Sequence, residues 1–149
     1  MSIVHATIEI DTPPERVWET IMNPDRLGEW VTIHRSVSEV SDRPLKQGST
    51  LRQVLHVRGV SFHVNWTLAA VTAPRRADWE GHGPAHSRAT IRYVLSGDGD
   101  GPTKFDYMNE FNPPGGKLGV LASRVIVGAA SEREANHSLN RLKALLERD

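Results

Sequence analysis

Polar side chains that could hold a small molecule alternate with aromatic ones in the stretch from Thr103 to Phe111. Tyr107 and Asn109 fall on the same side of that stretch as Phe105. Tyrosine hydroxyls and a carboxamide can orient a carbonyl or a phenol without any charge. An amide on a buried face is costly unless other groups donate to it and accept from it, so Asn109 is the sharpest clue. These residues are therefore the strongest candidates for a small-molecule site.

Other stretches with the same alternation add apolar and aromatic side chains to this candidate site. An apolar cavity that holds a few fixed polar groups is the usual form of a small-molecule site. The alternative is that these side chains only fill a core and satisfy one another, and the sequence leaves both open. No catalytic residue can be assigned. The predicted ligand-binding residues are Trp30, Val64, Trp66, Trp79, Ile91, Tyr93, Tyr107, Asn109, Phe111, Leu121, Val125 and Ala129.

Seven histidines raise an acid–base or metal hypothesis, because imidazole titrates near neutral pH. Three fall on the outward side of their strands by the alternation: His5, His56 and His63. His82 and His86 lie in a Gly-Pro loop, from which they could face the mouth of a cavity. Spacing within a loop fixes no metal geometry and no acidic ligand is adjacent, so we predict no metal site. His34 could reach the ligand entrance or could be exposed.

Two further motifs have the beginnings of an ion or phosphate site but lack an essential residue. Asp98 and Asp100, in a Gly-Asp-Gly-Asp-Gly run, would begin a calcium loop, but its twelfth position is Asn109 rather than an acidic residue. Residues 115–117 (Gly-Gly-Lys) are followed by Leu118, where a phosphate-binding loop needs Ser or Thr. We interpret them as a hairpin turn and as a hinge or helix cap, and predict no cofactor.

The composition fits one globular domain over residues 1–149. Eighteen basic and eighteen acidic side chains cancel, so nucleic acid is not an expected partner. The absence of cysteine excludes disulfides, thiolate nucleophiles and cysteine zinc sites. No stretch reaches the roughly 18 apolar residues of a membrane span, and the N-terminus lacks a basic and apolar leader. We therefore predict a cytoplasmic protein without integral membrane association.

Six strands and two short helices are expected to position the candidate site after an opening strand. The opening strand is Ile3 to Asp11, and Asp11 or Thr12 can cap the first helix, which carries two prolines in its first turn. A second short turn ends at Trp30. A very short connection at Gly59 requires its two strands to pair antiparallel. The six later strands are Ile33–Val40, Ser49–Arg58, Val60–Thr72, Arg75–Gly81, Ser87–Ser96 and Thr103–Phe111.

The C-terminal stretch, Lys117 to Glu147, has apolar residues at helical spacing and predicts one long amphipathic helix. At 1.5 Å per residue it would be roughly 45 Å long, so its apolar stripe needs a broad, curved surface. Glu132 and Arg133 interrupt that stripe, and one of them could turn into the cavity. Gly128 would allow a bend there that admits ligand. A curved antiparallel sheet closed by this helix is an α+β architecture.

Three local motifs then resemble the START-like, or SRPBCC, superfamily, across nearly the whole chain. Residues 11–18 read Asp-Thr-Pro-Pro-Glu-Arg-Val-Trp, similar to the family's Ala-Pro-Pro-Glu-x-Val-Trp entry into its first helix. Residues 23–30 read Asn-Pro-Asp-Arg-Leu-Gly-Glu-Trp, similar to its Asp-Pro-Glu-x-Leu-x-x-Trp second helix. Residues 138–143 read Ser-Leu-Asn-Arg-Leu-Lys, similar to its closing Ser-Leu-x-x-Leu-Lys.

The resemblance points to the polyketide cyclase/dehydrase-like branch and implies a single helix-grip domain. In that fold a sheet of about seven strands wraps around the long C-terminal helix, and a cavity between them takes a small hydrophobic ligand. The fold does not imply one chemistry. An enzyme of this branch would cyclise or dehydrate its substrate, with a tyrosine or a mouth histidine moving the proton. A non-enzymatic carrier or sensor, a chaperone-activator-type interaction protein and a homodimer all stay open.

Overall fold

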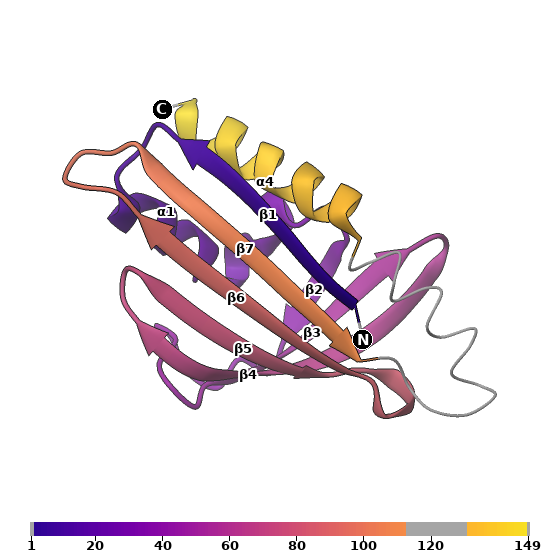
Figure 1. Ribbon diagram of the computed structural model, residues 1–149. Helices are drawn as coiled ribbons and strands as arrows, with labels where there is room; N and C mark the ends of the chain where they lie inside the picture. The colour runs from indigo at the N-terminus through magenta and orange to yellow at the C-terminus, as the bar shows by residue number, and fades with distance from the viewer. Residues whose placement is uncertain (1, 113–130, 149) are drawn as a thin grey trace.

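The computed structural model describes residues 2–112 and 131–148, which form one curved sheet with helices against it (Figure 1). Seven strands pair antiparallel in the order β1-β7-β6-β5-β4-β3-β2. The predicted α+β helix-grip architecture is confirmed. In chain order the elements are β1 (Ser2–Ile10), α1 (Pro14–Ile21), the 3-10 turn η1 (Pro24–Arg26), α2 (Leu27–Trp30), β2 (His34–Ser38), β3 (Thr50–Val57), β4 (Val60–Thr72), β5 (Arg76–His82), the 3-10 turn η2 (Pro84–His86), β6 (Arg88–Ser96), β7 (Thr103–Asn112) and α4 (Glu132–Glu147).

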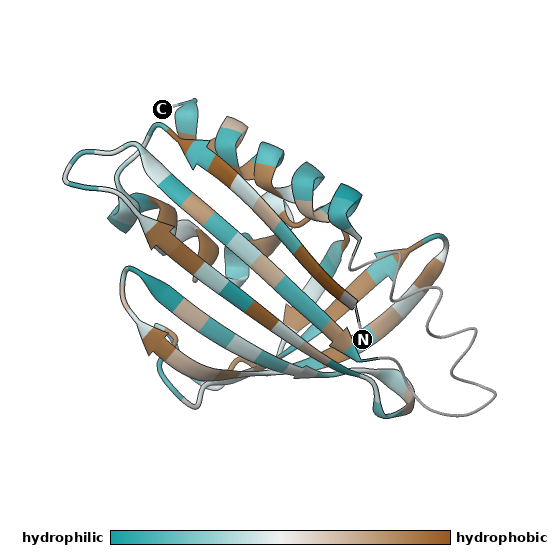
Figure 2. Ribbon diagram, viewed as in Figure 1, coloured by the Kyte–Doolittle hydropathy of each residue, from teal (hydrophilic) through white to brown (hydrophobic). Residues whose placement is uncertain are grey.

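The inner face of the sheet follows from the alternation of apolar and polar residues along each strand. In β4, exposed and buried side chains alternate from Ser61 to Trp66. Figure 2 shows the same alternation as brown and teal bands along β6 and β7. Since successive side chains point to opposite faces, all the buried ones meet on the concave side. The three histidines predicted to point outward are exposed: His5, His56 and His63.

The first helix starts at a proline pair rather than at a side-chain cap. Pro13 is the N-cap of α1, and its side chain has no acceptor for a backbone N–H, so the predicted cap by Asp11 or Thr12 is wrong. Both residues instead bind the last helix of the chain. The Asp11 backbone N–H donates to Glu147 Oε2 at 2.8 Å, and the Thr12 hydroxyl donates to the Leu146 carbonyl at 3.4 Å. The end of β1 is thus attached to the C-terminal end of α4.

The C-terminal helix begins at Glu132, so the prediction of one continuous helix from Lys117 to Glu147 is wrong at Ser131. Ser131 has extended backbone angles (φ −72°, ψ 155°), and its hydroxyl accepts the Glu134 backbone N–H at 3.2 Å. A serine in this geometry is a strong helix start, which apolar spacing alone does not detect. The rest of the predicted helix, with Gly128 and the predicted hinge or cap at residues 115–117, lies outside the described residues. Within α4 the predicted apolar stripe is buried: Ala135, Leu139, Leu142 and Leu146.

The free edge of β1 is covered at one end by α4. Lys143 Nζ donates to the Glu9 carbonyl at 2.7 Å and pairs with Glu147 Oε2, also at 2.7 Å. Unpaired backbone groups at a strand edge can bind a strand of another chain. The bond from Lys143 occupies one of these groups, the Glu9 carbonyl. At the other end of β1, Ile3 is 53% exposed.

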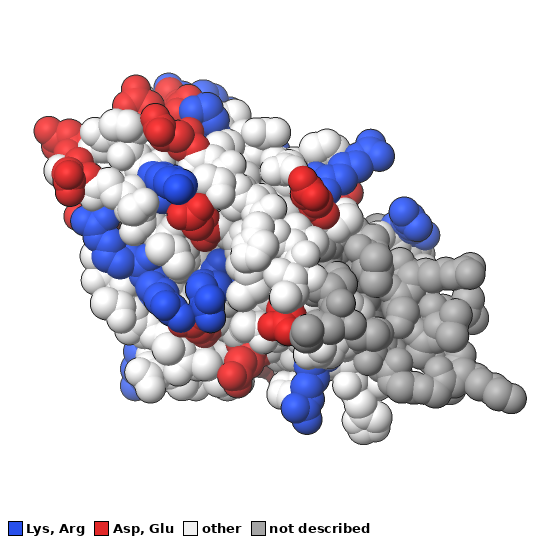
Figure 3. Space-filling model, viewed as in Figure 1, with Lys and Arg blue, Asp and Glu red and all other residues white. Residues whose placement is uncertain are grey.

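Charge on the surface is mixed. Figure 3 shows both acidic and basic side chains on the visible face, with several basic ones gathered at the left of the view beside acidic ones. On β5, for example, Asp78 pairs with Arg76 at 2.9 Å and with Arg92 of β6 at 2.8 Å. In the described part of the chain, no helix has the length and apolar character needed to cross a membrane.

Candidate functional site

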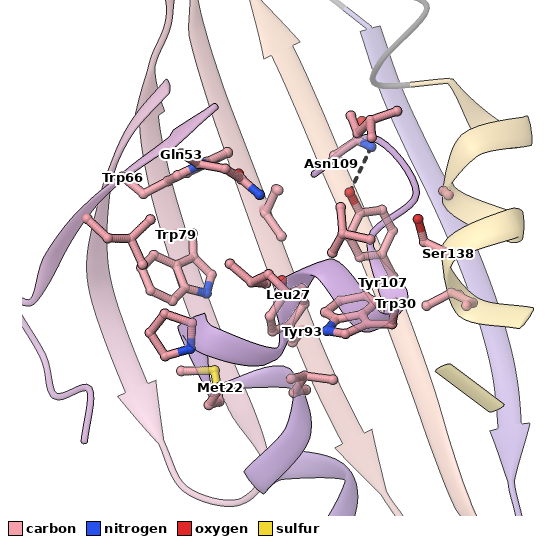
Figure 4. A pocket seen from close by; sticks show the side chains of 18 of the residues that line it. Met22, Leu27, Trp30, Gln53, Trp66, Trp79, Tyr93, Tyr107, Asn109 and Ser138 are labelled. Carbon is pink, nitrogen blue, oxygen red and sulfur yellow. Dashed lines mark hydrogen bonds between the residues drawn. The ribbon is translucent and has the colours of Figure 1, made fainter. Parts of the chain in front are cut away.

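Two pockets lie against the concave face of the sheet, and Figure 4 shows the first, which the helices also line. Their volumes are about 90 Å³ and about 110 Å³, counted as space that the centre of a water molecule can occupy. A single buried water needs only about 10–15 Å³ on this measure. Seven residues line both pockets: Val31, Ile33, Gln53, Trp66, Ile91, Tyr107 and Asn109.

One wall of the first pocket is built from packed aromatic rings. Trp30, at the end of α2, meets Tyr93 of β6 edge-on at a centroid distance of 6.1 Å and Phe105 of β7 at 6.4 Å. Tyr93 and Phe105 are also edge-on at 5.4 Å. Edge-to-face rings at these distances fix one another, so the wall is a rigid surface. Trp30 Nε1 is buried and has no hydrogen-bond partner among the described residues.

The amide of Asn109 is a buried polar group on the lining of both pockets. Its side chain is 5% exposed, and its Nδ2 donates to Tyr107 Oη at 3.1 Å. Its Oδ1 is buried without a partner in the described structure. A buried acceptor left unpaired costs about 1–3 kcal/mol. Since Tyr107 Oη accepts from Asn109, the hydroxyl hydrogen of Tyr107 remains to donate elsewhere.

The two lining tyrosines can donate hydrogen bonds but cannot act as bases at neutral pH. Burial raises the pKa of Tyr93, and the nearby Tyr107 raises it further. Burial also raises the pKa of Tyr107, although the hydrogen bond from Asn109 lowers it in part. Desolvation disfavours the charged phenolate, so both hydroxyls keep their protons.

Gln53 of β3 is a lining residue that the sequence analysis missed. It is 7% exposed, its Oε1 accepts from Trp66 Nε1 at 2.9 Å, and its Nε2 lies 2.8 Å from His34 Nδ1. The strand pattern carried a signal, because Gln53 alternates with the buried Leu51 and Leu55. Its partner Trp66 lies on the neighbouring strand, and the residue types alone do not predict this hydrogen bond.

Gly81 of β5 makes room for the indole of Trp66. A Cβ atom on Gly81 would lie 2.6 Å and 2.7 Å from two carbons of that ring, and 2.9 Å from a methyl group of Val64. Atoms at these distances overlap, so only glycine lets the ring lie across β5. The position of Trp66, and with it the bond to Gln53, depends on this glycine.

On the helical side, α4 contributes Glu134 and Ser138 to the first pocket. These residues are four apart and therefore share one face of the helix. Glu134 Oε2 accepts from the Thr32 hydroxyl at 2.6 Å, and Ser138 Oγ accepts from the Thr32 backbone N–H at 3.1 Å. The prediction that Glu132 or Arg133 turns into the cavity is wrong, because both are exposed and the helical phase places Glu134 there.

The second pocket is lined by the far ends of β4 and β7 and by the β5–β6 connection. Its apolar lining includes Phe62 and Val64 of β4 and Phe111 of β7, together with Leu55 of β3 and Ala89 and Ile91 of β6, and Pro84 belongs to η2. The predicted mouth histidines, His82 and His86, are exposed and are not on the lining of either pocket. Within residues 2–112 and 131–148, no three His, Asp or Glu side chains gather as metal ligands.

Nine of the twelve residues predicted for the site lie in the described chain, and all nine line a pocket. Seven line the first: Trp30, Trp66, Trp79, Ile91, Tyr93, Tyr107 and Asn109. Val64 and Phe111 line the second. The other three, Leu121, Val125 and Ala129, fall outside the described residues. Besides Gln53, Glu134 and Ser138, the prediction missed apolar lining residues that include Met22, Leu27, Ile33 and Leu51.

Solved structures with this fold include biosynthetic proteins. The Zhui aromatase/cyclase of Streptomyces sp. R1128 superposes with a TM-score of 0.81 over 99% of this chain and 94% of that one, at 18% identity. DynU16, from the dynemicin biosynthetic locus, has a TM-score of 0.67 at 16% identity, and the match covers 99% of this chain and 48% of DynU16. At such identities the likeness shows the fold alone.

The sequence comparisons give the family. Toxin Rv0910 of Mycobacterium tuberculosis is 25% identical over 83 residues, which are 56% of this chain and 58% of the toxin. The chain thus matches under two thirds of the length of its curated relatives. The family model described as polyketide cyclase / dehydrase and lipid transport matches residues 1–147. The chain therefore belongs to the polyketide cyclase / dehydrase and lipid transport family.

Proposed function

We propose that the protein binds an uncharged, largely apolar and flat molecule that donates a hydrogen bond to Asn109. The observation that carries this proposal is the buried Oδ1 of Asn109, which lies on the lining of both pockets and has no partner among the described residues. A ligand hydroxyl can donate to Oδ1 and accept from the Tyr107 hydroxyl at the same time. A phenol or an enol fits these two neighbours, whereas an ether or a hydrocarbon leaves Oδ1 unpaired.

The rest of the lining supports a flat and neutral ligand. Indole and phenol rings form much of the first pocket, and such rings favour stacked or edge-on aromatic partners. The lining charges are Glu134 in the first pocket and Arg88 and Glu110 in the second. Glu134 already accepts from Thr32, and a carboxylate beside an apolar cavity disfavours anionic ligands.

Binding without proton transfer is the function that the geometry supports best among the hypotheses. Neither tyrosine can remove a proton at neutral pH, and the mouth histidines are off the lining. A cyclisation in this pocket would rely on holding the substrate in a folded shape. The interaction-protein alternative has little support in the described chain, where the exposed large apolar side chains are Ile3 and Val60 on separate strands.

The test begins with native mass spectrometry of the protein as purified, to detect a retained small molecule. Binding of naphthalene, 1-naphthol and 1-methoxynaphthalene is then measured by quenching of tryptophan fluorescence, because three tryptophans line the first pocket. We expect 1-naphthol to bind roughly threefold to tenfold more tightly than the methyl ether, the worth of about one hydrogen bond.

Asn109→Leu should remove that preference while naphthalene still binds. Asn65→Leu is the matched control, since Asn65 is an exposed asparagine on the convex face of β4. If none of the three compounds binds, the site is not a ligand pocket. If 1-naphthol keeps its tighter binding in the Asn109 variant, its hydroxyl donates to another group and the proposed role of Asn109 is wrong.

A further inference from the structure

Gln53 is held in one amide orientation by two side chains that cannot exchange roles. Trp66 Nε1 carries a hydrogen and can only donate, so the atom 2.9 Å away must be the amide oxygen. The amide nitrogen then faces His34 Nδ1 at 2.8 Å. A flipped amide would place two donors against each other at the indole. The Trp66 bond therefore fixes which end of Gln53 is which.

The same bond fixes the tautomer of His34. The Gln53 nitrogen is a donor, so His34 Nδ1 must accept and must carry no hydrogen. The hydrogen of the neutral imidazole then lies on Nε2. Burial lowers the pKa of His34, which favours this neutral form. His34 is half-buried, at the start of β2, and is not itself on the lining of either pocket.

The arrangement leaves one hydrogen of the Gln53 amide nitrogen unused. His34 takes one of the two N–H groups, and no other bond to that nitrogen occurs in the described structure. Gln53 lines both pockets, and Figure 4 shows its nitrogen directed toward the middle of the pocket. A buried N–H without an acceptor is costly, so a ligand acceptor placed there would be favoured.

We propose that Gln53 donates a hydrogen bond to the ligand. His34 is the positioning residue that keeps the second N–H of the Gln53 amide directed at the ligand. This inference rests on the proposed function and deepens it. Gln53 lies on β3 and Asn109 on β7, with β6, β5 and β4 between them, so the curved sheet presents a donor and an acceptor from opposite sides. The ligand class is then an uncharged hydroxy-carbonyl compound, with its hydroxyl at Asn109 and its carbonyl at Gln53.

The test compares naphthalene with 1-acetylnaphthalene, which adds an acceptor and no donor. In the unaltered protein the acetyl compound should bind roughly threefold to tenfold more tightly than naphthalene. His34→Leu should abolish this ratio, because Gln53 is then free to turn its nitrogen away. His34→Asn should restore much of it, since the asparagine oxygen can accept where Nδ1 did. His56→Leu, an exposed histidine on β3, is the control and should keep the ratio.

A second measurement needs no substitution. Long-range ¹H–¹⁵N NMR of the imidazole rings should show His34 as the Nε2–H tautomer, with the unprotonated shift on Nδ1. A Nδ1–H tautomer would overturn the proposal. Equal effects of His34→Leu on naphthalene and on 1-acetylnaphthalene would also overturn it, because that is the result of a purely structural role. Failure of every naphthalene compound to bind would instead refute the proposed function, and this inference with it.

Discussion

The two lining amides, Gln53 on β3 and Asn109 on β7, have the same chemistry but different surroundings. Gln53 is held from two sides, by an indole N–H and by an imidazole nitrogen. Within the described part of the chain, Asn109 has one partner, Tyr107, and its oxygen has none. Gln53 is therefore oriented by the protein itself, whereas the Asn109 oxygen is paired only when a ligand donates to it. Removing each amide should therefore have opposite effects on the ligand-free protein.

The largest expected effect comes from the glycine that supports the Gln53 side. Gly81→Ala places a methyl group against the Trp66 ring, which is rigid and has no free end to move aside. Overpacking together with the lost Trp66–Gln53 bond should lower the free energy of unfolding by about 3 kcal/mol, measured by urea denaturation. Gly28→Ala is the control, because its added Cβ would meet His34 at an ordinary 3.5 Å. Equal stability of the two variants would show that Trp66 is free to move.

Gln53→Leu should lower the free energy of unfolding by about 2 kcal/mol. The substitution leaves Trp66 Nε1 buried without its acceptor, and an unpaired buried donor costs more than the bond itself is worth. Gln47→Leu, at an exposed glutamine before β3, controls for the change in side-chain type. No loss of stability would mean that the pre-orientation of Gln53 contributes nothing.

Asn109→Leu should raise the free energy of unfolding of the ligand-free protein by about 1 kcal/mol. The variant loses the bond to Tyr107 and adds apolar contacts, and it removes a buried oxygen that no described residue contacts as a hydrogen-bond donor. The same urea titration with Asn65→Leu gives the baseline. A destabilised Asn109 variant would contradict the contrast between the two amides.

The smallest effect is a pH dependence that belongs to His34. Burial holds the folded-state pKa of His34 below its unfolded value of about 6.5, so the unfolded chain takes up a proton more readily. The contribution of His34 to stability is then fully present above about pH 7 and is lost as the pH falls through the lower, folded pKa. The stability difference between wild type and His34→Asn should shrink on acidification. A difference that grows would show that the folded state favours the charged imidazole.

Strand periodicity was enough to place most of the sheet and the inward side of the site. The predicted strand Val60–Thr72 has the same bounds as β4, because apolar residues alternate from Phe62 to Leu68 and Gly59 marks its start. The position of Asn109 followed for the same reason. Alternation is a local property, and these features depend on local sequence alone.

What could not be predicted depends on contacts between distant elements. Gln53 acquires its role from Trp66 and His34, which the pairing of β3 with β4 and β2 brings to it. The start of α4 depended on a serine cap, while the apolar spacing suggested a helix that continued through it. Glu134 rather than Glu132 lines the pocket because the helical phase, set by that start, turns it toward Thr32.

The position of β1 at the edge of the sheet has a consequence for how the chain is made. β1 pairs only with β7 in the described sheet, and its other edge meets α4, whose contacts to Glu9 and Asp11 span 134 and 136 residues. During synthesis β1 therefore has no strand partner until β7 has left the ribosome. Such a sheet-closing pair should form late in folding, because it joins segments far apart in the sequence.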